Sequence, residues 1–180
     1  MADPKTIVAA VMSAAAAASM ALGLATSALQ TDEGKRNTGY FDPARIPTDC
    51  FGHTGPDVVV GKRKTDAQCA DQLQHDTDQH MKGVLRCTPS LAGHPYQLAA
   101  ATRLTFNIGV PAYCGSTAAR KFKAGDWHGA CDAFLPWHNI TVSKPIAANC
   151  TRRATGGYLC ALPGLVSRRA RERAMCLTGL

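Results

Sequence analysis

Residues 33–55 read EGKRNTGYFDPARIPTDCFGHTG and join a predicted helix to a predicted β-hairpin. Within this stretch Glu33, Asp42 and Thr48 follow the order Glu-x8-Asp-x5-Thr. A reaction that protonates a leaving oxygen needs an acid, and the activation of water needs a second carboxylate, beside which a hydroxyl can hold the water. A Glu on a helix and an Asp on the following β-loop could face each other across a cleft. Taken alone, the same spacing also arises by chance, as three exposed polar residues near a turn.

The composition suits one globular domain with an appendage. The chain has 180 residues, a net charge of +7 and 46% apolar residues, which is enough to form a packed core. These values argue against a collagen-like, coiled-coil or multi-span membrane protein. All eight cysteines lie at residue 50 or later, and so many dispersed cysteines are unusual in a reducing cytosol. The cysteines therefore indicate an oxidising compartment.

The N-terminal segment is different in character. Residues 7–29 read IVAAVMSAAAAASMALGLATSAL, without a single charge and with ten alanines. As a helix at ~1.5 Å per residue they would span roughly 34 Å, enough for a hydrocarbon core of ~30 Å. Alanine lacks the favourable insertion energy of Leu, Ile or Phe, so the segment would be held only weakly. We favour a segment that inserts and can leave the bilayer. The alternatives are a signal peptide cleaved near Ala25–Ala28, a permanent anchor and a soluble Ala-rich helix.

Local signals predict a small β-containing lobe, a connecting helix and a helical lobe. The predicted helices cover 31–37, 66–86, 95–107 and 165–176, with two short ones capped by Ser116 and Asp126. The helix at 66–86 begins with a capping-box pattern at Thr65–Gln68. Residues 38–63 predict a small β-hairpin region, and residues 136–164 predict an irregular segment.

Further motifs follow in the order found in one known family. They are FNIG at 106–109, STAARK at 116–121, AGD and GACD within 124–132, and GLVSRRARER at 164–173. Together with residues 33–55 they resemble phage-type lysozymes, glycoside hydrolase family 24, over nearly all of residues 31–178. With the N-terminal segment, the chain resembles signal-anchor-release endolysins of phages that infect Gram-negative hosts. It departs from the pattern at Arg45, where many relatives have glycine, at Cys50, where some relatives have glycine, and in a longer loop at 138–163.

The resemblance implies an α+β, lysozyme-like fold, with a small β-hairpin lobe joined by a long helix to a helical lobe and preceded by an apolar signal-anchor helix. Residues 1–30 would be the signal-anchor-release segment and residues 31–180 the catalytic domain. The implied reaction is hydrolysis of the β-1,4 bond between N-acetylmuramic acid and N-acetylglucosamine in peptidoglycan, with inversion. Glu33 would be the general acid, Asp42 the carboxylate that activates water and Thr48 the supporting hydroxyl.

Two other functions stay open. A lytic transglycosylase uses one Glu and lets the 6-hydroxyl of the sugar attack, and the presence of Asp42 and Thr48 speaks against it. A non-enzymatic, disulfide-stapled protein that binds the cell wall is the second alternative.

The resemblance also implies a route of delivery. Residues 7–29 would cross the host inner membrane once, with the catalytic domain on the periplasmic side. Only Gln30 to Asp32 separate this segment from Glu33, so the tethered form is expected to be inactive. Loss of membrane potential through a holin or pinholin, without required direct contact, would release the protein into the periplasm. We expect a monomer with no cofactor, no metal and no nucleic-acid partner.

Spacing alone does not choose among the 105 pairings of eight cysteines. Cys150–Cys160 closes a short loop and is favoured, and Cys50–Cys69 would pin the β-lobe to the connecting helix. On the lysozyme-like layout Cys131 and Cys176 lie on helices that pack together. That layout leaves Cys87–Cys114.

The remaining candidates have simpler interpretations. His53 could line the substrate site, although a structural histidine beneath the sheet is favoured. His75 and His80 with neighbouring aspartates suit a solvated helix face better than a metal site, since the chain has no His-Glu-x-x-His and no Cys-x-x-Cys. For Trp127 and Trp137, core packing is favoured over stacking on a sugar.

The last thirty residues contain six Arg and one Glu. Such positive charge would favour an approach to anionic cell wall or lipid surfaces. The equally weighted alternative is a solvated helix face combined with arginines that form internal ion pairs.

Overall fold

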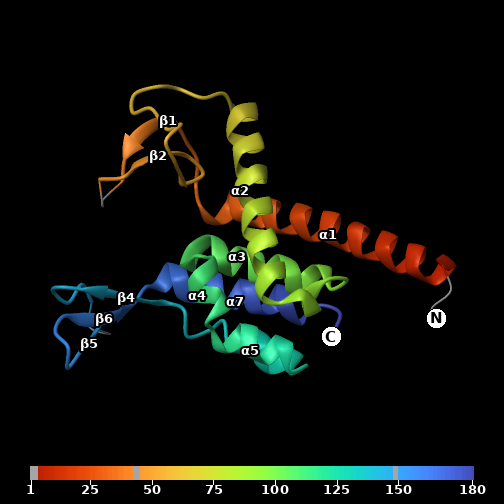
Figure 1. Ribbon diagram of the computed structural model, residues 1–180. Coiled ribbons are helices and arrows are strands. Elements are labelled where there is room, and N and C mark those ends of the chain that lie inside the picture. The colour runs from red at the N-terminus through yellow and green to blue at the C-terminus, as the bar shows by residue number, and fades with distance from the viewer. Residues whose placement is uncertain (1–3, 43–44, 148–149) are drawn as a thin grey trace.

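The computed structural model describes residues 4–42, 45–147 and 150–180, with side chains from residue 14 onward. Figure 1 shows a helical body from which two small sheets and one long helix project. In chain order the elements are α1 (Pro4–Asp32), β1 (Arg36–Phe41), β2 (Pro47–Cys50), β3 (His53–Thr54), α2 (Asp66–Cys87), the 3-10 helix η1 (Pro89–Leu91), α3 (Pro95–Ile108), α4 (Val110–Cys114), α5 (Thr117–Lys123), α6 (Trp127–Asp132), β4 (Asn139–Val142), β5 (Cys150–Arg152), β6 (Tyr158–Ala161) and α7 (Pro163–Leu177). The expected α+β arrangement, a β-lobe joined by a long helix to a helical lobe, is confirmed.

The first helix continues without a break to Asp32. Its last turn is closed by the Glu33 N–H, which donates to the Leu29 carbonyl at 3.0 Å. Gly34 follows with φ of 64°, the left-handed conformation that commonly ends helices. The separate helix predicted over 31–37 is therefore wrong, because the chain turns at Gly34 and enters β1 at Arg36.

The C-terminal half of α1 packs into the body, against α3 and α2. Ala21, Ala25 and Leu29 have no exposed surface. Because they recur every four residues, they lie on one face of the helix, and the two alanines let the helix backbones approach closely. Within the described part of the chain, no helix combines the length and apolar character needed to cross a membrane.

The first sheet has the order β1–β2–β3 and overlaps the hairpin region predicted over 38–63, although β1 begins two residues earlier, at Arg36. Thr48 pairs with Tyr40 on one side and with Thr54 on the other, so it lies on the central strand. The apolar run at 58–60 passes beside β1, with a single bridge between Gly39 and Val60. A Cβ at Gly39 would collide with the Val59 carbonyl, so this approach requires glycine.

Local capping signals are confirmed where the sequence predicts them. At the start of α2 the Gln68 N–H donates to Thr65 Oγ1 at 3.1 Å, and the Thr65 N–H donates to Gln68 Oε1 at 2.8 Å. Ser116 accepts from the Ala119 N–H and starts α5. Asp126 accepts from the Gly129 N–H and starts α6. The predicted helices at 66–86, 95–107 and 165–176 correspond to α2, α3 and α7.

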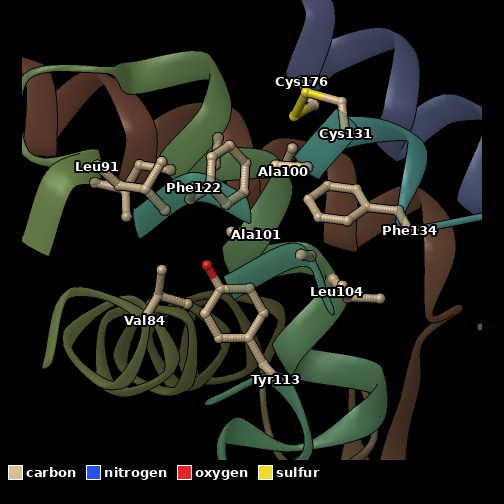
Figure 2. Close-up of a cluster of buried hydrophobic side chains, with 14 of the residues drawn as sticks. Val84, Leu91, Ala100, Ala101, Leu104, Tyr113, Phe122, Cys131, Phe134 and Cys176 are labelled. Carbon is tan, nitrogen blue, oxygen red and sulfur yellow. A yellow bond between two sulfur atoms is a disulfide. The ribbon is translucent and has the colours of Figure 1, made fainter. Parts of the chain in front are cut away.

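The main core surrounds α3, whose Ala99, Ala100 and Ala101 have no exposed surface. Figure 2 shows Phe122, Phe134 and Tyr113 gathered around Ala100 and Ala101. A second, smaller cluster lies under the first sheet and joins the end of α1 to that sheet and to α2. Its buried members are Leu29, Cys50, Phe51, Cys69 and Leu73.

Residues 139–147 and 150–161 contain a second antiparallel sheet of order β4–β6–β5, and the irregular segment predicted over 136–164 is wrong in this part. The central strand β6 pairs with both neighbours: Ile140 and Cys150 are both partners of Cys160. Such short strands have no stability alone and form only when a third strand provides partners. This third strand lies too far along the chain to be detected from local sequence patterns.

The structure contains four disulfides, Cys50–Cys69, Cys87–Cys114, Cys131–Cys176 and Cys150–Cys160. They are the pairs that the sequence analysis favours. Cys131–Cys176, visible in Figure 2, joins α6 to α7 at the edge of the main core.

Candidate active site

Glu33 lies one residue beyond the end of α1, with its side chain 22% exposed. Its Oε1 forms an ion pair with Arg168 Nη1 of α7 at 2.5 Å. Its Oε2 points toward the β2–β3 turn, where a Cβ built on Gly52 would lie 3.9 Å away. One carboxylate oxygen is therefore held by a cation, while the other is directed toward the first sheet.

The neighbouring Asp32 locks the helix end in place. Its side chain is 1% exposed and forms ion pairs with Arg103 at 2.6 Å and with Arg171 at 2.8 Å. Burial alone would raise the pKa of Asp32, but hydrogen bonds from Arg103 and Arg171 and their charges bring it below its ordinary value. A carboxylate that is buried and paired in this way fixes α1 against α3 and α7, and so fixes Glu33.

Arg168 is itself held by Glu172, one turn further along α7, at 3.2 Å. Glu172 has no exposed surface and also pairs with Arg169 at 2.7 Å. Burial raises the pKa of Glu172, against the opposing effect of Arg169, Arg168 and Arg103. The arginine that contacts Glu33 is thus part of a buried network and has little freedom to move.

Asp42 and Thr48 are brought together by the turn between β1 and β2. Asp42 Oδ1 accepts from the Ile46 N–H at 2.8 Å, and the Thr48 hydroxyl donates to the Ile46 carbonyl at 2.9 Å. Thr48 is buried, and because its proton is used on Ile46, its oxygen lone pairs remain as acceptors. Among the described residues, Asp42 Oδ2 has no hydrogen-bond partner.

Two departures from the family pattern have a structural consequence. Arg45 has φ of 64° and Cys50 has φ of 51°, both in the left-handed region that favours glycine. The turn that holds Asp42 and the end of β2 therefore keep a glycine-like backbone although neither residue is glycine. The Cys50–Cys69 disulfide ties one of these positions to α2.

His53 binds two carboxylates, with Nδ1 2.7 Å from Asp76 Oδ2 and Nε2 3.0 Å from Asp57 Oδ1. Burial lowers the pKa of His53, but the two carboxylates outweigh it and raise the pKa above its ordinary value. The His53 hydrogen bond correspondingly lowers the pKa of Asp57 to about 2. Since both ring nitrogens are occupied, this geometry supports the structural interpretation of His53, which joins β3 to α2.

Of the other candidates from the sequence, His80 packs against Phe106, at 5.1 Å between ring centroids, and lines a hollow that also includes Gly52 and His53. In the described residues, no group of three or more His, Cys, Asp and Glu side chains is arranged to hold a metal ion. Trp127 stacks against Phe122 and His94, at 5.6 and 4.3 Å between ring centroids. Trp137 lies partly buried against the main core.

Sequence reasoning missed the residues that position Glu33. The sequence patterns give no role to Asp32, Arg103 or Glu172, and they place Arg168 only within the motif at 164–173 and the basic C-terminal stretch. One signal was present: Glu172 lies four residues after Arg168 and three after Arg169, the spacing at which side chains meet on a helix. Nothing local indicated that Asp32 is their partner.

Comparisons with known proteins agree with this architecture. A family model described as "Phage lysozyme" matches residues 30–172. The SAR-endolysin of Pseudomonas phage phiKMV is 31% identical over 160 residues, covering 87% of this chain and 88% of that protein. The endolysin of Salmonella phage P22 is 30% identical over 154 residues, covering 83% of this chain and 92% of that protein. A solved structure of a P22 lysozyme variant, 30% identical, superposes with a TM-score of 0.66 over 86% of this chain and 95% of that one.

Proposed function

The chain belongs to the phage lysozyme family, and we propose that it hydrolyses the β-1,4 bond between N-acetylmuramic acid and N-acetylglucosamine. The observation that carries this proposal is the placement of the two carboxyls. Glu33 is fixed at the end of α1 by a buried arginine network, and Asp42 is fixed on the first sheet beside Thr48. The relatives named endolysin and SAR-endolysin support the same function.

In the proposed reaction Glu33 protonates the glycosidic oxygen as the bond to C1 breaks. Oε2 is the oxygen for this proton, since Oε1 is engaged by Arg168. After transfer, Arg168 stabilises the carboxylate that forms. Inside a partly buried site such a pair is stronger than in water.

Asp42 takes a proton from the attacking water through Oδ2, while Oδ1 is held by the Ile46 N–H. The Thr48 oxygen accepts a hydrogen bond from the same water and orients it toward C1. The water adds to C1 from the face opposite the leaving oxygen, so the configuration inverts. This geometry requires the two carboxyls to be separated by roughly 6.5–9.5 Å in the complex. Protons and electrons balance without a cofactor.

Product analysis tests this function. Purified peptidoglycan digested by the protein is expected to yield reducing N-acetylmuramic acid ends, released as the inverted anomer in a nuclear magnetic resonance time course. Products with 1,6-anhydro ends would instead identify a lytic transglycosylase. Binding to cell walls without any cleavage would identify a wall-binding protein that is not an enzyme.

We further propose that residues 1–30 act as a signal anchor that holds an inactive form at the inner membrane, facing the periplasm. The support is the uncharged segment at 7–29 and the relatives named SAR-endolysins. Ala21, Ala25 and Leu29 are core residues of the folded protein. The same side chains cannot lie in a bilayer and in this core, so the two placements exclude each other.

In this proposal Asp32 couples the docking of α1 to activity. Its ion pairs with Arg103 and Arg171 form only when the end of α1 is docked on α3 and α7. Because Glu33 follows directly, docking also completes the site. A holin or pinholin that dissipates the membrane potential would trigger release without direct contact, and the released protein would act as a monomer.

A further inference from the structure

The arginines of the C-terminal thirty residues divide into two groups. Four of them are paired with carboxylates of the body; these are Arg168, Arg169, Arg171 and Arg173. The other two, Arg152 and Arg153, lie on or beside β5 and are exposed. Within the described ranges, neither forms an ion pair, and the Arg153 side chain donates only to Thr141 Oγ1, at 3.1 Å.

The second sheet contributes nothing to either hydrophobic cluster, as far as the described residues show. It is instead held together by its own strand pairing and by the Cys150–Cys160 disulfide. At its base the Leu162 N–H donates to the His138 carbonyl at 3.0 Å. The sheet is thus an internally stabilised arm, which we define as residues 139–147 and 150–161, and core packing does not explain its presence.

The charged side chains of the arm are all positive. No Asp or Glu occurs between Asp132 and Glu172, while the arm carries Lys144, Arg152 and Arg153. Positive groups without internal partners remain available to an anionic ligand. An arginine guanidinium in particular matches a carboxylate with two parallel hydrogen bonds.

The two arginines lie beside a hollow of about 740 Å³. Its lining also includes Ser143, Tyr158 and the glycines of the β5–β6 turn. Gly156 and Gly157 have φ of 90° and 73°, and the Gly156 N–H donates to the Arg153 carbonyl at 3.1 Å. The turn therefore has a defined shape, and Tyr158 adds a ring that can pack against a peptide or sugar.

The arm is attached to the helix that holds the proposed acid. β6 ends at Ala161 and leads into α7, the helix that carries Arg168. In Figure 1 the arm and the first sheet, which carries Thr48, project from the helical body toward the same side of the view. A polymeric substrate that reaches Glu33 would extend beyond it, within reach of such an arm.

We propose that the arm is a second substrate-binding surface, on which Arg152 and Arg153 bind carboxylates of the stem peptides of peptidoglycan. The inference rests on the proposed muramidase function and names the part of the substrate that the arm recognises. Stem peptides carry free carboxylates at regular intervals along the polymer, which fits two adjacent cations. A lipid surface is the competing source of negative charge, and the test separates the two.

The test measures binding of the full-length chain carrying Glu33→Gln, so that the polymer is not degraded. The arm variant adds Arg152→Gln and Arg153→Gln. The matched control adds Arg86→Gln and Lys123→Gln, which remove the same charge from exposed positions on α2 and α5. Each protein is sedimented with intact sacculi, with sacculi whose carboxylates are amidated, with glycan strands stripped of peptide, and with phosphatidylglycerol vesicles.

The arm variant is expected to bind intact sacculi about 3–10-fold more weakly than its parent, as two exposed ion pairs allow. The control variant should bind like the parent. On amidated sacculi and on stripped glycan the arm variant and the parent should bind equally. Equal binding of both to intact sacculi, the same loss on stripped glycan, or a loss seen only on vesicles would each overturn the proposal.

Failure of this inference is distinct from failure of the proposed function. If the wild-type chain yields reducing ends but the arm variant binds like its parent, only the arm loses its role. If the wild-type chain yields no reducing ends, the muramidase proposal itself fails, whatever the sedimentation shows.

Discussion

At the scale of single residues, one ion pair governs the proposed acid. Arg168 holds Glu33 Oε1 at 2.5 Å and is itself held by Glu172. The carboxyl is therefore oriented by α7, although it belongs to the end of α1. The proposed chemistry requires a proton from the Glu33 carboxyl, and this can be tested without disturbing the network.

We predict that Glu33→Gln removes lytic activity while the fold is kept. Gln has the same shape and can still accept from Arg168, but it cannot give up a proton. Acid catalysis typically contributes ~10²–10⁴-fold, so less than about a hundredth of the rate should remain. The assay is the fall in turbidity of outer-membrane-permeabilised cells. More than about a tenth of the wild-type rate in a normally folded variant would end the assignment.

Asp42→Asn is the companion variant. It keeps the acceptor for the Ile46 N–H but loses the oxygen that takes the proton from water, so activity should again be severely reduced. A circular dichroism melt that matches the wild type serves as the control for folding. Similar losses in both variants are expected if the two carboxyls act in one step.

At the scale of elements, α1 packs into the folded body, and the proposed tethered form would place the same helix in the membrane. Ala14–Ala17 lie on the helix ahead of the residues that pack into the core, and Ala15 and Ala16 are exposed. Changes there alter the affinity for lipid with little effect on core packing. This makes the segment suitable for testing release.

Replacing Ala14–Ala17 with Leu should strengthen anchoring by about 2 kcal/mol in total. The variant is expected to stay in the membrane fraction and to delay or prevent lysis. Ser at the same four positions is the matched control and should shift the protein toward the soluble fraction. Lysis as prompt as wild type, with the Leu variant fully membrane-bound, would show that release is not the switch. A mature N-terminus near residue 28–30 would favour a cleaved signal instead.

A second contact between elements is sensitive to pH. His53 joins β3 to α2 through Asp76 and also binds Asp57. Although burial opposes it, the carboxylates raise the pKa of His53 in the folded state. The folded protein thus holds the proton more tightly than the unfolded chain, whose histidine has a pKa of about 6.5. The stabilisation is fully present below pH ~6.5 and is lost as the pH rises through the folded-state pKa.

Urea unfolding at pH 5.5 and at pH 8.5 tests this dependence. Between these values the wild type should lose more stability than His53→Asn, which cannot titrate. Parallel losses in the two proteins would contradict a role for His53 in the pH dependence.

At the scale of the whole molecule, the disulfides differ in the parts of the structure that they join. Cys131–Cys176 spans 45 residues and fastens α7 to the main core, whereas Cys150–Cys160 spans 10 residues within the arm. The loop-closure model gives about 4 kcal/mol for the first and about 3 kcal/mol for the second. Because the arm lies outside both hydrophobic clusters, its disulfide should matter less for global unfolding than this model gives.

We therefore predict that the double variant Cys131→Ala, Cys176→Ala lowers the free energy of unfolding by about 4 kcal/mol. Cys150→Ala, Cys160→Ala should lower it by clearly less, measured by urea denaturation with oxidised wild type as reference. A larger loss for the arm variant would show that the arm folds as part of the core.

The sequence by itself determined the features whose partners lie within about one helical turn. The capping box at Thr65 and the caps at Ser116 and Asp126 are of this kind, and the order of Glu33, Asp42 and Thr48 can be read directly along the chain. Only the tertiary structure decided which charged side chains form pairs and where the small residues are buried. Asp32 and Arg171 are partners 139 residues apart, β6 forms only between two other strands, and Ala21 or Ala25 would suit lipid as well as core. Local preference carries no information about such distant partners, because their energy exists only once the chain has brought them together.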